Sequence, residues 1–190
     1  MHGVGLRTLI ESSTGRWETL GELTARAEGA AEANEDTPCQ FNWRSLLVCA
    51  LGLAQLGEED EARRLETKAR AAAVVAGPPE REPALLRLAL LRGDLEEALR
   101  ILEHLPPAGD AWGLDAAAAR LDALAALGDR SRVEQEAASF LDEQSYTRPF
   151  AVRALGLVRR DEGLVAEAIS DFEAIGLEWR ADETRALLPA

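Results

Sequence analysis

The sequence predicts an all-α fold, and three observations carry this prediction. The 190-residue chain is dominated by alanine, leucine, glutamate and arginine, which favour helix over sheet. Apolar residues recur at intervals of three and four over most of the chain, a spacing that gathers them on one face of a helix. Strand signals are weak, because the longest β-branched runs are pairs such as Val74-Val75 inside helical patterns.

A register of glycines indicates that the helices come in pairs. Five glycines stand 42, 36, 35 and 35 residues apart, namely Gly15, Gly57, Gly93, Gly128 and Gly163. Glycine tolerates the unusual backbone angles of a helix-hairpin turn. Five residues after each glycine lies an apolar residue, namely Leu20, Ala62, Ala98, Val133 and Ala168. This internal repeat predicts an α-solenoid of about five degenerate antiparallel helix pairs in a single domain.

The first two predicted hairpins cover residues 4–33 and 42–76. In the first, residues 4–12 form one helix and residues 17–33 the other, with Gly21 and Gly29 weakening the second helix. In the second hairpin, apolar residues follow helical spacing over three turns, namely Trp43, Leu46, Leu47, Ala50, Leu51 and Ala54. The acidic run 58–61 then opens the partner helix, where the helix dipole favours negative charge.

The third predicted hairpin, residues 80–105, contains the clearest helix start in the chain. Asp94 is placed to cap the second helix, and Glu97 three residues later completes a capping box. Five apolar residues of this helix are expected to face inward, namely Leu95, Ala98, Leu99, Leu102 and Leu105. Neither helix of the pair can bury such a stripe alone, so the hairpin needs neighbours.

The last two predicted hairpins cover residues 114–141 and 150–175, and a capping helix covers residues 179–188. The expected core of the fourth hairpin is Leu121, Leu124, Leu127, Val133, Phe140 and Leu141. The expected core of the fifth is Leu155, Val158, Val165, Ala168, Ile169 and Phe172. A final amphipathic helix would cover the open end of the stack.

Charge and composition disfavour several function classes. The net charge of −13 repels phosphate backbones and anionic lipid, so neither nucleic acid nor membrane is an expected partner. Cys39, Cys49, His2 and His104 form no set at metal-ligand spacing. No stretch approaches the roughly 18 apolar residues of a membrane span, and no secretory leader is recognisable, so the expected location is cytoplasmic.

No catalytic signature stands out either. The chain lacks a Gly-x-Ser-x-Gly elbow, and its only lysine, Lys68, does not lie in a phosphate-binding loop. We therefore expect a protein without enzymatic activity, cofactor or metal.

The repeats resemble the tetratricopeptide repeat, whose units have about 34 residues. Ala50 and Gly156 match its small first-helix position, and Phe172 matches its second-helix aromatic residue. Residues 37–57 and 168–188 are similar to the C-terminal helical arms of large bacterial signalling ATPases, including LuxR-type regulators of the MalT-like kind and ATPases described as adenylate cyclases. The resemblance implies a sensing or scaffolding arm of a signalling or transcriptional regulator. A phosphate-binding loop and a helix-turn-helix are both missing, so the chain would be the arm alone, as a fragment or a free-standing relative.

The resemblance also implies a binding groove lined by the first helices of the pairs. Groove positions lie thirteen, ten, six and three residues before each turn glycine. The candidate binding residues at these positions are Arg44, Leu47, Leu51, Arg87, Leu90, Asp122, Phe150, Arg153, Leu157 and Arg160. The hypothesis is that the arginines pair with the carboxylates of an acidic or C-terminal peptide, while the apolar residues add contact area.

Two alternatives stay open. The groove arginines could instead pair internally with Glu80, Asp115 and Asp122. The ligand could be a small-molecule effector, held in the groove or between repeats, rather than a protein or peptide. Self-association is also compatible with the sequence.

Overall fold

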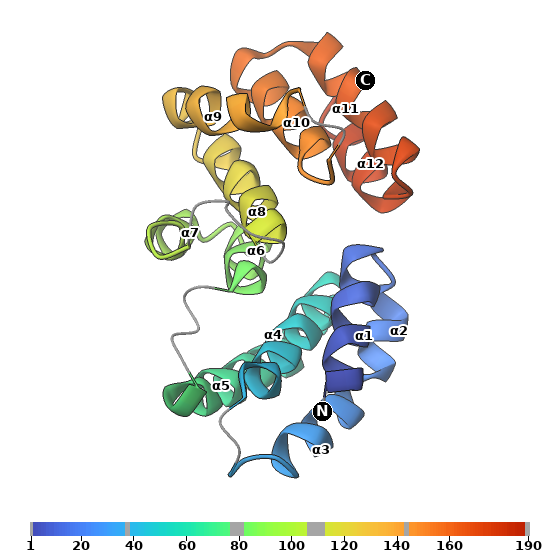
Figure 1. Ribbon diagram of the computed structural model, residues 1–190, viewed down its shortest axis with the longest axis vertical. Coiled ribbons are helices and arrows are strands. Elements are labelled where there is room, and N and C mark those ends of the chain that lie inside the picture. Colours follow the sequence, from blue (N-terminus) through green and yellow to red (C-terminus); the bar gives the residue numbers. More distant parts are fainter. Residues whose placement is uncertain (1, 37–38, 77–81, 106–112, 143–144, 189–190) are drawn as a thin grey trace. The chain divides into compact units, whose positions relative to one another are not determined.

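The computed structural model describes residues 2–36, 39–76, 82–105, 113–142 and 145–188 (Figure 1). These residues form helices joined by turns and contain no strand, so the all-α prediction is confirmed for them. The chain divides into two compact units, Met1–Arg92 and Gly93–Ala190. The single domain, the solenoid arrangement and the number of repeats stay predictions.

The first unit is built around one buried helix. Its elements are α1 (His2–Ser13), α2 (Trp17–Glu22), α3 (Thr24–Glu32), α4 (Gln40–Gln55), α5 (Glu59–Ala76) and α6 (Pro83–Leu91). Each of the other five helices packs against α4, and all residues of α4 from Phe41 to Leu53 are buried. The predicted single helix over residues 17–33 is wrong, because the chain bends at Leu23 between α2 and α3. The two glycines in this segment, Gly21 and Gly29, lower its helix propensity.

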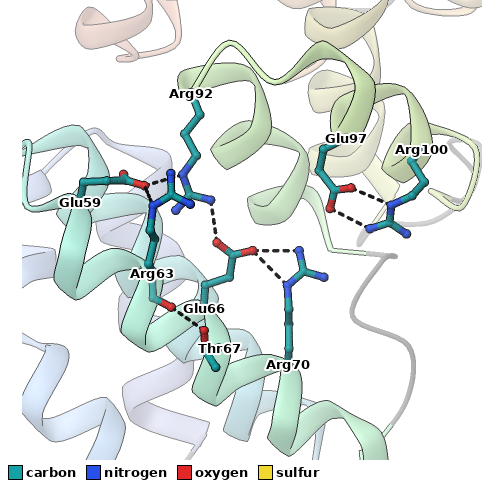
Figure 2. A network of polar contacts seen from close by, with 8 residues as sticks. All are labelled: Glu59, Arg63, Glu66, Thr67, Arg70, Arg92, Glu97 and Arg100. Carbon is teal, nitrogen blue, oxygen red and sulfur yellow. Dashed lines mark hydrogen bonds and ion pairs between the residues drawn. The ribbon is translucent and has the colours of Figure 1, made fainter.

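A network of charged side chains fastens the end of α6 to α5 (Figure 2). Arg92 caps the C-terminus of α6, and its guanidinium binds Glu59 at 2.8 Å and Glu66 at 2.7 Å, both on α5. Glu66 also accepts hydrogen bonds from Arg70, and Glu59 pairs with Arg63. Burial raises the pKa of Glu66, and the hydrogen bonds from Arg92 and Arg70 outweigh that effect and lower it. Glu66 therefore stays ionised at neutral pH.

The second unit is organised around α10. Its elements are α7 (Leu95–Leu102), α8 (Gly113–Ala126), α9 (Arg130–Ala137), the short 3₁₀ helix η2 (Ala138–Phe140), α10 (Arg148–Arg159), α11 (Glu162–Ala174) and α12 (Glu178–Arg185). Helix α10 packs against α8, α9 and α11, while α12 packs against α11 and α7 against α8. Leu121, Phe150 and Phe172 are completely buried at its centre. Leu141, expected in this core, is 38% exposed.

The same left-handed turn recurs at several of the connections between helices. Gly15, Gly57, Gly93 and Gly128 have φ angles of 70°, 81°, 69° and 69°, in the left-handed region predicted for them. After α4, the Gly57 amide donates to Ala54 O at 3.1 Å and the Glu58 amide donates to Leu53 O at 2.9 Å. These two bonds close a Schellman motif, which satisfies carbonyls at the helix end.

The fifth turn is not at the predicted glycine. Arg160 has φ 56° and makes the left-handed turn, whereas Gly163 lies inside the first turn of α11. The spacing of five residues between a turn residue and a buried apolar residue nevertheless holds when it is counted from Arg160, because Val165 is 4% exposed. Gly176 repeats it once more, with φ 76° and with Ala181 fully buried five residues on.

The predicted start of helix α7 is confirmed, but the face of α7 that is buried differs from the prediction. The Glu97 amide donates to the Asp94 carboxylate at 3.0 Å, which is the predicted cap. Ala98, Leu102 and Leu105 are buried as expected, but Leu95 and Leu99 are 44% and 43% exposed. The buried stripe runs through Ala98, Ile101, Leu102 and Leu105 against α8, and this leaves Leu95 and Leu99 beside it.

Candidate functional site

The apolar members of the predicted groove are core residues. Leu47 and Leu51 on α4 are 0% and 2% exposed, and Phe150 on α10 is 0% exposed. Their assignment to an open groove surface is therefore corrected: a fully buried side chain cannot touch a partner without displacing its neighbours. Leu90 and Leu157 are half-buried.

The predicted arginines divide between buried and exposed positions. Arg44 is 7% exposed and forms an ion pair of 2.9 Å with Glu82, the residue that precedes α6. This agrees with the internal-pairing alternative, although with Glu82 as the acid; Glu80 lies outside the described residues. Arg87 is half-buried, and Arg160 is exposed at the turn after α10.

Three of the ten candidates come together in the second unit. Asp122 of α8 and Phe150 and Arg153 of α10 meet Phe172 of α11 and the start of α12. Helix α12 adds three residues that the sequence reasoning did not select, Trp179, Arg180 and Glu183. We call this set the arginine cluster: Asp122, Phe150, Arg153, Phe172, Trp179, Arg180 and Glu183.

Two guanidiniums share two carboxylates in the arginine cluster. Arg153 donates to Asp122 Oδ1 and, at 3.0 Å, to Glu183 Oε2. Arg180 donates to the same Glu183 oxygen at 2.7 Å and lies 3.7 Å from Asp122 Oδ2. Thr184 accepts a further bond from Arg153 at 3.2 Å and donates to Arg180 O at 2.6 Å.

Aromatic rings enclose both guanidiniums. Arg153 lies 5.5 Å from the Phe150 ring centre and 5.2 Å from that of Phe172. Arg180 lies 5.2 Å from the Phe150 ring and 4.0 Å from the Trp179 ring. Ring faces attract cations, and this attraction is stronger where water is excluded. The rings thus hold two like charges close together inside the unit.

Arg153 and Glu183 of the arginine cluster stay charged at neutral pH. Burial disfavours the charged form of Arg153, but Asp122 and Glu183 outweigh it and raise the pKa of the guanidinium. Burial likewise raises the pKa of Glu183, and the charges of Arg180 and Arg153 outweigh it and lower the pKa below its usual range. Paired guanidiniums of this kind are the groups that proteins use to bind carboxylates and phosphates.

One signal in the sequence could have identified Arg180. Arg180, Ala181 and Thr184 share the inward stripe of the terminal helix, and an arginine on such a stripe requires a buried acid. The acid is Asp122, 58 positions earlier in the chain, so no local pattern connects the two.

Comparisons with models of protein families, with curated proteins and with solved structures return no match. Within the described residues, no group of histidine, cysteine and carboxylate side chains is arranged to hold a metal ion. None of the helices in the same part of the chain combines the length and the apolar character that a bilayer crossing needs.

Proposed function

We propose that the chain is a non-enzymatic helical-repeat module that binds another protein, as a sensing or scaffolding arm of a bacterial signalling or transcriptional regulator. The observation that carries the proposal is a pair of exposed leucines on α7. Leu95 and Leu99 are 44% and 43% exposed and stand one helical turn apart, so they form one apolar spot. Paired apolar residues on a helix are the usual anchors of helix recognition.

Carboxylates border this spot. Glu96 on α7 and Glu103 directly after it are exposed, and Glu97 is held by Arg100 through two hydrogen bonds of 2.7 Å (Figure 2). We define the α7 face as Leu95, Glu96, Leu99 and Glu103. The contact is assigned to this face rather than to the groove, because Leu47, Leu51 and Phe150 are buried.

The charge of the α7 face indicates the chemistry of its partner. An amphipathic helix with a leucine stripe and flanking lysines or arginines would match both the apolar spot and its acidic border. The net charge of −13 would also increase the rate at which such a basic partner arrives. The proposed partner is therefore a protein segment that forms a basic amphipathic helix.

Binding of a synthetic leucine–lysine amphipathic peptide tests the proposal. We expect the double variant Leu95→Ser, Leu99→Ser to bind it about tenfold or more weakly than wild type, since about 1.4 kcal/mol corresponds to tenfold. The matched control is Leu6→Ser, Ile10→Ser, two exposed apolar residues one turn apart on α1. Equal affinity of the α7 variant and wild type, with both folded by circular dichroism, would refute the proposal.

A further inference from the structure

Glu183 differs from the other charged members of the arginine cluster in its access to solvent. The side chains of Arg153, Arg180 and Asp122 are 6%, 7% and 11% exposed, whereas that of Glu183 is 45% exposed. Glu183 lies near the end of α12, and its flexible side chain reaches back to the guanidiniums from the solvent side. Its carboxylate can therefore rotate away into water, while the other three groups are held in place.

The bonding of Glu183 is also not the arrangement that guanidiniums prefer. Arg153 and Arg180 both contact the single oxygen Oε2, at 3.0 and 2.7 Å. The strongest pairing of a guanidinium and a carboxylate uses both oxygens in parallel bonds. A carboxylate not tethered to α12 could present one oxygen to each arginine.

We propose that Arg153 and Arg180 form a binding site for a small soluble carboxylate, which enters from the solvent side and takes the place of the Glu183 carboxylate. Asp122 forms ion pairs with both arginines and balances one of their two positive charges, so one further carboxylate neutralises the other. The site therefore selects a monocarboxylate over a phosphate, whose second charge would be left uncompensated.

Binding would replace one of the ties that attach α12 to the rest of the unit. In the structure Glu183 connects α12 to Arg153 on α10. When a ligand takes the place of its carboxylate, Glu183 returns to water and the ligand itself bridges Arg180 of α12 and Arg153 of α10. The site is independent of the α7 face used under the proposed function.

Thermal unfolding in sodium acetate, sodium phosphate and sodium chloride at equal ionic strength and pH 7 tests this proposal. A ligand that binds the folded protein raises the midpoint with its concentration. We expect acetate to raise the midpoint of wild type above that in chloride, and Glu183→Ala to show the same shift at roughly tenfold lower acetate, since the internal competitor is gone. The control Asp182→Ala removes an exposed carboxylate of α12 that pairs with Arg185, and should behave as wild type.

Three outcomes would overturn the proposal. In the first, acetate raises the unfolding midpoint of neither wild type nor Glu183→Ala above that in chloride. In the second, acetate raises the midpoint of Glu183→Ala alone. In the third, phosphate raises the midpoint as strongly as acetate does. If Glu183→Ala does not fold, Glu183→Gln keeps the shape of the side chain without its charge. The chemical shifts of the Arg153 and Arg180 side-chain N–H groups, followed during an acetate titration, then give the same comparison directly.

Discussion

At the scale of single residues, one backbone conformation sets the spacing of the helices. Most of the left-handed turns use glycine, which adopts positive φ without a steric penalty, but the turn after α10 uses Arg160. A side chain in this conformation costs roughly 1–2 kcal/mol. The cost is met by the two hydrogen bonds of the motif, from Arg160 to Leu157 O and from Asp161 to Gly156 O.

Glycine substitutions should change stability in opposite directions according to φ. Gly128→Ala places a methyl group in open space but at φ 69°, so we expect a loss of about 1 kcal/mol. Gly29→Ala is the matched control, because its methyl group is equally unobstructed but lies within helix α3, and we expect a gain of about 0.5–1 kcal/mol. Arg160→Gly should likewise stabilise. Urea unfolding checks all three, and a stabilised Gly128→Ala would contradict the account.

At the scale of helices, a buried arginine reinforces contacts between elements that also pack against one another. Arg120 of α8 is 8% exposed and donates to Leu102 O at 2.8 Å and Leu105 O at 3.1 Å, the carbonyls at the end of α7. The same guanidinium pairs with Glu136 of α9. One side chain thus caps one helix and ties two others together.

Removing this cap should be far more costly than removing a surface ion pair. We expect Arg120→Met to lower the free energy of unfolding by about 2–4 kcal/mol, because it leaves two carbonyls and a carboxylate without their donor. Arg100→Met, which removes the exposed pair with Glu97 on α7, should cost less than about 0.5 kcal/mol. Similar losses for the two variants in urea unfolding would show that Arg120 is not an important cap.

The positions of the helices were accessible from the sequence, whereas the choice of face often was not. Apolar spacing and the Asp94 cap are local signals, so the start of α7 agrees with the prediction, although α7 ends at Leu102 rather than at Leu105. Whether Leu95 is buried depends on which helix packs against it, and the local sequence around Leu95 does not contain that information. The same holds for Arg180, whose partner Asp122 is distant in the chain. Gly163 fits the spacing of the predicted turn glycines, but the turn lies three residues earlier, at Arg160, where no glycine marks it.

At the scale of the whole molecule, ion pairs lower the pKa of several carboxyl groups of this acidic protein. Several carboxyls have a lowered pKa, namely Glu28, Glu61, Glu66, Glu134 and Glu183. For Glu28 the hydrogen bond from Arg64 is the largest cause, burial opposes it, and Lys68 adds to it, giving a pKa of about 2. Glu28 therefore stabilises the fold above its unfolded pKa of about 4.3, and this contribution is lost as pH falls toward about 2.

The folded protein should have a lower isoelectric point than its composition gives. Ordinary pKa values place that point near pH 4.7. Carboxyls with lowered pKa keep their negative charge further into acid, so the native protein reaches zero net charge at a lower pH. We expect native isoelectric focusing to give a band at a lower pH than the band obtained in urea. Identical positions would show that the ion pairs do not persist in solution.

The burial of α4 has a consequence for the order of events on the ribosome. Helices α1, α2 and α3 each pack more extensively against α4 than against one another. Because residues 2–36 are synthesised before α4 begins at Gln40, their apolar faces have no template until that later segment emerges. Residues 2–36 are therefore expected to fold only when α4 has emerged.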